Sequence, residues 1–206
     1  IIFTEVMRMK SKVFFVPVED AENIDAVNRK LKLLLAESRV LSVAEAAQKV
    51  VVKLHFGEEG TYSYVRPAHL RLICDEIAKK GSAPYLSDAN TLYRGKRLNS
   101  EDHHAVAMTH GFTKEAVGVD VFIPDERKGE DLCDVPIDQG FIKIAKVGRC
   151  YLDTDAFIAV THFKGHGMTS FGGTLKNIGM GCATRAGKLA QHCDTVPTYY
   201  ADKCIG

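Results

Sequence analysis

The sequence predicts an α/β fold with a largely parallel sheet and helices on both of its faces. Short runs rich in β-branched residues alternate with amphipathic segments along most of the 206 residues, which is the pattern of a sheet built from β–α units. The run AFIAV at 156–160 is apolar throughout, as in a strand whose two faces are both covered. Hydrophobic residues make up 46% of the chain, enough to form a substantial core.

The first half of the chain alternates between predicted strands and helices. Apolar runs with β-branched or aromatic residues predict strands at 12–18, 50–54 and 84–86. Apolar residues at helical spacing predict helices at 23–38, 42–48 and 67–81. Ser42 provides a capping side chain for the second of these helices, and Pro67 suits the first turn of the third.

The second half continues the alternation with one interruption. We expect a helix at 99–110, a strand at 117–123 and a strand at 156–160. Between the last two strands, residues 130–147 contain short apolar stretches punctuated by Gly and Pro, which predicts an inserted β-hairpin. A glycine-rich loop follows residue 160, and helical patterns extend to about His192.

The overall composition narrows the class of protein. A formal net charge of +1 without basic clusters argues against nucleic-acid binding, and no apolar run is long enough for a membrane span. The six cysteines form no CxxC pair, so we expect a reducing, cytoplasmic compartment. Cys74 and Cys150 sit in apolar surroundings and are expected to be small buried hydrophobes.

Polar residues gather after the predicted strands. In open α/β sheets, ligands bind beyond the carboxyl ends of the strands, so these loops are expected to converge on one cleft. The residues concerned are His55, Gly57, Glu58 and Glu59; Asp88, Asn90, Tyr93 and Arg94; Asp125 and Arg127; and His162, Lys164 and His166.

The segment from Thr161 to Cys193 carries the strongest functional signal. It holds two histidines four positions apart, a lysine between them, and six glycines between 165 and 181. This density of glycine indicates tight turns or close approach of the backbone to a ligand.

One interpretation of this segment is a metal site. His162 and His166 could supply imidazole ligands, and the glycines beside them favour a loop over a helix. Two histidines are too few for a closed site, so Cys182, His192, His55 or an acidic residue would have to complete it.

A second interpretation is an anion site, in which glycine N–H groups and Lys164 or Lys176 surround a phosphate or carboxylate. No standard phosphate loop matches, because Gly173 stands where a Walker A loop has its lysine. A third interpretation gives Lys164 or Lys176 a catalytic role as acid, base or covalent attachment point.

Several strings resemble the DUF362 family, specifically its members described as iron–sulfur cluster-binding proteins. The strings are KLHFGEEG (53–60), SDANTLYRGKR (87–97), HGF (110–112), THFKGHGMTSFGGTLKNIGMGC (161–182) and GKLAQHC (187–193). A more distant likeness to the N-terminal domain of nickel-pincer lactate racemase implies an α/β cleft around a metal-bearing cofactor. It supports no residue-by-residue transfer.

The resemblance also implies a domain organisation. Members of this group commonly continue into a ferredoxin-like module that opens Cys-Ile-Gly-Cys, and this sequence ends at Cys204-Ile205-Gly206. We therefore expect one α/β domain over 1–200, with 201–206 as the start of a truncated or disordered module. A [4Fe–4S] cluster is expected in the full-length protein and not in this chain, because one cysteine cannot hold a cluster.

The leading hypothesis is a redox-linked iron–sulfur protein with a His/Lys/Gly-rich cleft for an unidentified small molecule. The alternative is a non-catalytic module that binds a metal, a cofactor or a partner. An enzyme would be of oxidoreductase type, and an additional metal ion is an open possibility. The catalytic candidates are Lys164 and Lys176. The ligand-binding candidates are His55, Asp88, Asn90, Arg94, Gly172, Gly173 and Asn177. The metal-ligand candidates are His162, His166 and Cys204.

Overall fold

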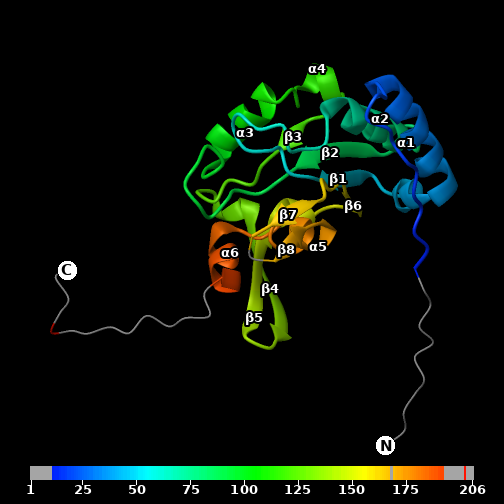
Figure 1. Ribbon diagram of the computed structural model, residues 1–206. Helices are drawn as coiled ribbons and strands as arrows, with labels where there is room; N and C mark the ends of the chain where they lie inside the picture. Colours follow the sequence, from blue (N-terminus) through cyan, green and yellow to red (C-terminus); the bar gives the residue numbers. More distant parts are fainter. Residues whose placement is uncertain (1–10, 168, 193–201, 203–206) are drawn as a thin grey trace, which may run out of the picture.

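A four-stranded parallel sheet forms the centre of the computed structural model, which describes residues 11–167, 169–192 and 202. The strands are β1 (Lys49–Lys53), β2 (Ala83–Ser87), β3 (Val121–Phe122) and β6 (Ala156–Ala159), in the order β3-β2-β1-β6 (Figure 1). The chain thus builds outward from β1 to β3 and then returns to place β6 on the other side of β1. This reversal creates a topological switch point between β1 and β6, where open α/β sheets bind ligands.

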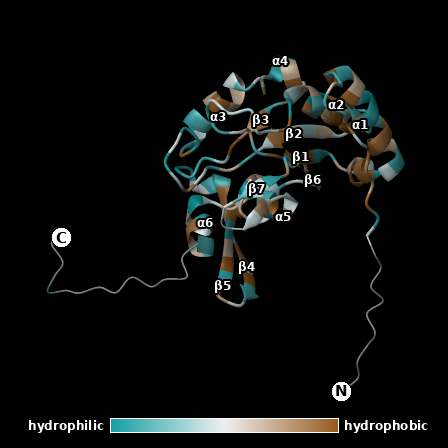
Figure 2. Ribbon diagram, in the orientation of Figure 1, coloured by the Kyte–Doolittle hydropathy of each residue, from teal (hydrophilic) through white to brown (hydrophobic). Residues whose placement is uncertain are grey.

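One face of the sheet is covered by the first four helices (Figure 1). These are α1 (Ile24–Ser38), α2 (Pro67–Ala78), α3 (Ser100–Thr109) and α4 (Lys114–Val117). Two of them begin at asparagine caps, since Asn23 accepts from the Ala26 amide and Asn99 from that of Asp102. In Figure 2, α1 and α2 carry hydrophobic and hydrophilic stretches side by side, as expected of helices that cover a sheet.

The larger core lies between these helices and the sheet. Its centre is formed by side chains of β1 and α2, including Val50, Val52, Leu70 and Ile77, all fully buried. Val51 points to the opposite face, as strand alternation requires, and packs there in a smaller cluster of buried residues: Ala89, Cys150, Tyr151 and Cys182.

The opposite face is covered by shorter elements. The antiparallel hairpin β4 (Leu132–Gln139) and β5 (Ile142–Gly148) projects from the body of the molecule, beside α6 (Arg185–His192) (Figure 1). Nearby lie α5 (Thr174–Gly179) and a second small hairpin, β7 (Lys164–His166) with β8 (Ser170–Gly172). Three 3₁₀ turns complete the described structure: Val40–Ala44, Gly129–Asp131 and Arg149–Tyr151.

The predicted fold class is confirmed, with helices on both sides of a parallel sheet and an inserted hairpin close to 130–147. Cys74 and Cys150 are buried, as expected. Among the described residues, no helix combines the length and the apolar character needed to cross a bilayer.

Three element predictions are wrong. Residues 12–18 form no strand, because they pair with none of the strands in the described residues, and Val13 and Phe15 remain exposed. The helix predicted at 42–48 is a 3₁₀ turn that inserts Leu41 and Ala44 into the core. The run at 117–123 is divided, since Gly118 ends α4 in a left-handed conformation and only two residues pair in β3.

The glycine-rich segment after β6 also differs from expectation. Instead of an irregular loop, it forms the β7–β8 hairpin, in which Lys164 pairs with Gly172 and His166 with Ser170. The hairpin folds the segment back on itself, so residues on either side of 168 lie on one small surface. This surface forms one wall of the cavity described next.

Candidate ligand-binding site

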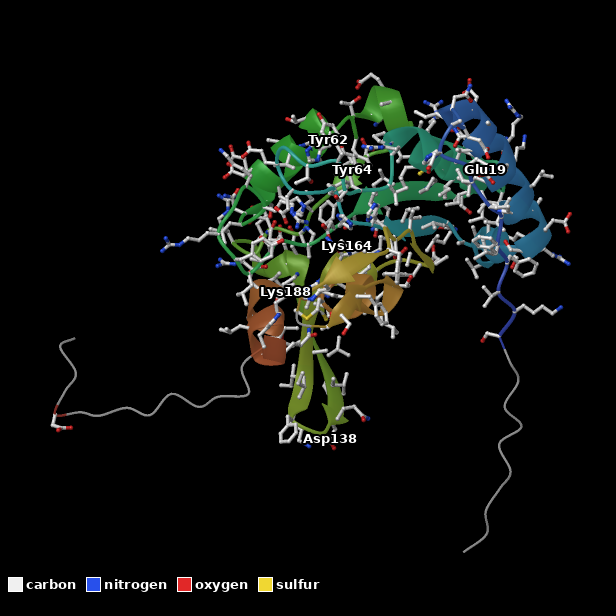
Figure 3. The ribbon with its side chains drawn as sticks, viewed as in Figure 1. Glu19, Tyr62, Tyr64, Asp138, Lys164 and Lys188 are labelled. Carbon is white, nitrogen blue, oxygen red and sulfur yellow. The ribbon has the colours of Figure 1, made fainter. Side chains whose placement is uncertain are left out.

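A cavity of about 490 Å³ opens beyond the carboxyl ends of β1, β2 and β6. This is the edge of the sheet that contains the switch point between β1 and β6. The cavity is lined by His55, Asp88, Ala89, Thr91, Leu92, Tyr93, Arg97, Thr161, His162, Lys164, His166, Gly172, Gly173, Lys176, Asn177, Met180, Gly181, Lys188 and His192. Figure 3 shows Lys164 and Lys188 on the same side of the sheet, although they come from β7 and α6.

A buried lysine lies behind the residues that line the cavity. Lys53, the last residue of β1, has no exposed surface. Its ammonium donates to Asp88 Oδ1 at 2.9 Å, Asn177 Oδ1 at 2.8 Å and the carbonyl oxygen of Leu54 at 2.7 Å. These three bonds use all three donors of the ammonium. Lys53 therefore ties β1 to the loop after β2 and to α5, and it has no donor left for a ligand.

Within the described part of the chain, Asp88 is the only carboxylate that lines the cavity, and other groups already balance its charge. Its second oxygen accepts from Arg97 Nη1 at 3.2 Å and lies 3.5 Å from His103 Nε2. Burial alone would raise the pKa of Asp88, but Lys53, His103 and Arg97 together hold it well below its ordinary value. Asp88 is thus ionised and fully paired within the protein.

Arg97 connects this network to the rim of the cavity. Besides Asp88, its guanidinium contacts the carboxylate of Glu58 and donates to Tyr93 Oη at 2.8 Å. Burial would lower the pKa of Arg97, but its hydrogen bond to Glu58 and the charge of Asp88 raise it. The network holds two cations against two carboxylates and is close to electrically neutral.

The remaining charges of the cavity are positive. Lys164 on β7, Lys176 on α5 and Lys188 on α6 all line it. Among the residues that the structure describes, no carboxylate lies within ion-pair distance of these three lysines. The cavity therefore presents an excess of positive charge that no acidic side chain in the described chain neutralises.

Two histidines in the cavity have ring nitrogens without a partner among the described residues. His55 Nδ1 accepts from the Gly57 amide at 3.2 Å, so its Nε2 carries the proton when the ring is neutral, and that Nε2 is buried and unpaired. His162 Nδ1 is also buried and unpaired, and its ring meets that of His55 edge to face at 6.1 Å. Burial lowers the pKa of His55 to about 4. Since buried polar atoms are normally hydrogen-bonded, a bound ligand or solvent is their natural partner.

Comparison with known proteins identifies the family. A family model described as "Domain of unknown function (DUF362)" matches residues 50–204. The chain belongs to the DUF362 family. The match begins at β1 and includes every residue that lines the cavity. No curated protein sequence matches the chain.

The DUF362 chain also resembles a solved structure, the lactate racemase apoprotein from Thermoanaerobacterium thermosaccharolyticum. The TM-score is 0.53 at 16% sequence identity, and the match covers 74% of this chain and 34% of the racemase chain. The DUF362 chain thus spans about a third of the length of that protein. At this identity the likeness shows a shared α/β fold.

Most of the residues singled out from the sequence lie in this cavity of the DUF362 domain. They are His55, Asp88, His162, Lys164, His166, Gly172, Gly173, Lys176 and Asn177. Asn90 lies just behind it, where its amide donates to Ser100 Oγ and its Oδ1 is 3.2 Å from His103 Nδ1. Arg94 is exposed and does not line the cavity, and Cys204 lies outside the described residues.

Two further expectations have different outcomes. Asp125 and Arg127 pair with each other away from the cavity, so three of the four predicted loops converge and the fourth does not. Within the described part of the chain, no group of three or more His, Cys, Asp or Glu side chains is placed to hold a metal ion. His162 and His166 would therefore need other ligands to bind one.

Three charged residues of the site were missed by sequence analysis: Lys53, Arg97 and Lys188. Lys53 had a visible signal, since a lysine inside the apolar run VVVKL must be buried with a partner if the run is a central strand. Arg97 and Lys188 had no such signal, because they lie in polar surroundings where lysines and arginines are usually solvated.

Proposed function

We propose that this DUF362 domain binds an anionic organic cofactor or substrate, one that carries a carboxylate or phosphate group, in the cavity at the β1/β6 switch point. The observation that carries the proposal is a set of three cavity lysines, Lys164, Lys176 and Lys188, that have no acidic partner among the described residues. They lie beside a buried network that is already neutral. An anion that enters this site encounters uncompensated positive charge on several sides.

The walls of the cavity suit an organic ligand. Leu92, Tyr93 and Met180 contribute apolar surface, which ligand sites generally combine with a few fixed polar groups. Asn177 is one fixed group, because Lys53 holds its oxygen while its amide donates to Thr161 Oγ1 at 2.9 Å. The neutral His55 ring offers a further hydrogen-bond partner for a polar atom of the ligand.

The fold supports a cofactor as the ligand class. The solved structure that the chain resembles is described as an apoprotein, a protein without its cofactor, of a lactate racemase. We infer a cofactor in the present cavity from the charges of the cavity and from its position at the switch point.

The more specific proposal is a redox-linked protein of oxidoreductase type. It is supported by the resemblance of Cys204-Ile205-Gly206 to the start of a ferredoxin-like module, whose [4Fe–4S] cluster in the full-length protein would exchange electrons with the bound ligand. The cysteine pattern supports a cytoplasmic location. Anaerobic iron and sulfide analysis of the full-length protein tests this: about four irons and four sulfides per chain are expected, and their absence contradicts the redox role.

The alternative function is a non-catalytic module that binds and delivers a cofactor. The saturated hydrogen bonding of Lys53 and Asp88 favours a rigid binding site, since neither side chain is free to exchange protons with a ligand. Turnover of a bound ligand by the cluster-loaded protein distinguishes the two functions. Only the redox-linked enzyme is expected to convert it.

Anion binding is tested by calorimetry with pyrophosphate and with citrate. The double variant Lys164→Met/Lys176→Met removes two cavity cations, and we expect its affinity for both probes to fall by about tenfold, because each partly exposed charge contributes about 0.5–1 kcal/mol. The matched control is Lys143→Met/Lys146→Met, which removes the same charge from the exposed β5 strand, where Asp138 and Asp134 pair with these lysines.

The control variant should keep the wild-type affinity to within about twofold, since its lysines lie outside the cavity. Equal affinities for the two double variants, or no measurable binding of either probe by the wild-type protein, contradict the proposed function.

A further inference from the structure

Lys188 differs from the other lysines of the cavity in its environment. It is only 7% exposed, and its ammonium donates to the carbonyl oxygen of Ala183, just before α6. The side chain nevertheless lines the cavity. Lys164 is exposed, and Lys53 is fully buried with all donors in use. Lys188 is therefore a buried amine that faces the ligand space and is held by a backbone carbonyl.

The backbone of Lys188 is fixed by close packing of α6 on the hairpin. A Cβ at Gly187 would lie 2.3 Å from the carbonyl oxygen of Lys146 on β5, so only glycine allows this approach. The Thr184 amide donates to that same carbonyl at 2.9 Å, and the Lys188 amide donates to the Thr184 carbonyl at 2.7 Å. The helix thus holds Lys188 at a set position relative to the cavity.

The charged and titratable groups that face Lys188 come from four elements. The pKa of Lys188 is lowered to about 8, and burial is the largest cause. The charge of Lys53 on β1 also lowers it. Three groups act in the opposite direction: Asp88 after β2, Glu126 after β3 and Cys182 before α6. At pH 7 about a tenth of the Lys188 amine is then unprotonated, a far larger share than in an ordinary lysine, which is almost wholly charged. A neutral amine is the nucleophilic form.

We propose that Lys188 is the reactive amine of this cavity and forms an imine with the carbonyl group of a bound oxo acid or phosphorylated aldehyde. The proposal rests on the proposed function, because the anionic group of such a ligand would be held by Lys164 and Lys176. It adds the class of ligand: an anion that also carries a ketone or aldehyde.

The covalent step balances without another reactant. The lone pair of Lys188 Nζ attacks the carbonyl carbon and forms the C–N bond, the carbonyl oxygen takes up a proton, and a carbinolamine results. The carbinolamine then loses water and becomes the imine, with a C=N bond. The water contains the former carbonyl oxygen and the two protons of the neutral amine. His192 lines the same cavity, and its Nδ1 lies 2.8 Å from the Lys188 carbonyl oxygen. A carbonyl only accepts, so Nδ1 donates and Nε2 is the acceptor nitrogen of the neutral ring.

The test is reductive trapping with glyoxylate, a small oxo acid, and cyanoborohydride at about neutral pH. Peptide mass spectrometry then measures the carboxymethyl group on each lysine. We expect Lys188 to be labelled about tenfold faster than the exposed Lys143 and the half-buried Lys146, because of its larger neutral fraction. Pyrophosphate should protect Lys188 by occupying the cavity and should leave the other two unchanged.

Several results would overturn the proposal. Labelling of Lys188 no faster than that of Lys146, in a protein that binds pyrophosphate, refutes the reactive amine and leaves anion binding intact. Fast labelling of Lys188 that pyrophosphate does not slow, with no pyrophosphate binding by calorimetry, refutes the proposed function and with it the carbonyl-anion ligand. The variants Lys188→Arg and Lys188→Met should each lose the fast-labelled peptide, with folding verified by circular dichroism; a fast-labelled peptide that persists in both identifies another amine.

Discussion

Replacing Lys188 by methionine should stabilise the protein near neutral pH. The two side chains have similar lengths, so methionine fills the same space and removes a charge that burial disfavours. The pKa of Lys188 is lowered from 10.5 to about 8, and each unit corresponds to about 1.4 kcal/mol. Burial of the ammonium therefore costs about 3 kcal/mol of folding free energy. Methionine also loses the hydrogen bond to the Ala183 carbonyl, which offsets about 1 kcal/mol of the gain. We therefore expect the free energy of unfolding to rise by about 2 kcal/mol.

The stability difference between Lys188→Met and the wild-type protein should also depend on pH. Below the folded-state pKa of about 8, Lys188 is protonated in both states, and the folded state carries the full cost. As the pH rises from about 8 toward 10.5, the folded state releases its proton first, and the cost shrinks. The advantage of Lys188→Met should thus be largest below about pH 8 and should decline at higher pH.

Urea denaturation followed by far-ultraviolet circular dichroism measures this advantage across the pH range. A Lys188→Met protein that is less stable than wild type at neutral pH, with a difference that does not change up to about pH 10, would refute the reasoning. That result would mean that Lys188 is an ordinary charged lysine in a well-solvated position.

Two further predictions concern Lys53 and its surroundings. Lys53→Met should destabilise the protein by about 3–5 kcal/mol in urea denaturation, because a buried carboxylate loses its partner. Adding Asp88→Asn to Lys53→Met should recover part of the lost stability. The control is Lys49→Met, at the exposed start of the same strand, which should change the stability little. Equal losses of stability in Lys53→Met and Lys49→Met contradict the role of the network. Gly181→Ala should lower the melting temperature and weaken citrate binding, since a Cβ there would lie 2.0 Å from a backbone oxygen of α5 and 2.6 Å from Lys53 Nζ. Gly179→Ala has open space around it and serves as the control, so similar losses in both variants would show that packing at 181 is not the cause.

The sheet could be predicted from the sequence because its strands are apolar on both faces. The runs at 50–54 and 156–160 both form strands: β1 lies inside the described sheet, and β6 pairs with it at the edge. The run at 12–18 looks equally apolar in the sequence, but an apolar segment becomes a strand only when a neighbour supplies its hydrogen bonds. None of the strands that the structure describes pairs with this run, and a local sequence pattern does not contain that information.

The location of the cavity was predictable for a topological reason. Parallel strands bring their carboxyl ends to one edge, so the loops with His55, Asp88 and His162 had to meet. Arg94 and Arg97 show the limit of that reasoning, since both follow the same strand and only Arg97 turns inward to Asp88. Which side chain of a loop faces the ligand depends on turn geometry, and the sequence does not specify it.

Burial is the other property that sequence reasoning could not supply. Lys164 and Lys176 stood out because they lie among glycines and histidines, whereas Lys188 lies in an ordinary amphipathic helix. Its distinct character comes from burial and from the charges of Asp88, Lys53 and Glu126, which belong to three other parts of the chain. Only the folded structure brings these groups to the same lysine.

The central claim, that the cavity beyond β1 and β6 is an anion site, is tested most directly by crystals soaked in tungstate, a heavy tetrahedral oxyanion. We expect an anomalous peak inside the cavity, within hydrogen-bonding distance of Lys164 or Lys176. A peak only at surface lysines such as Lys143, with the cavity free of tungstate, would contradict it.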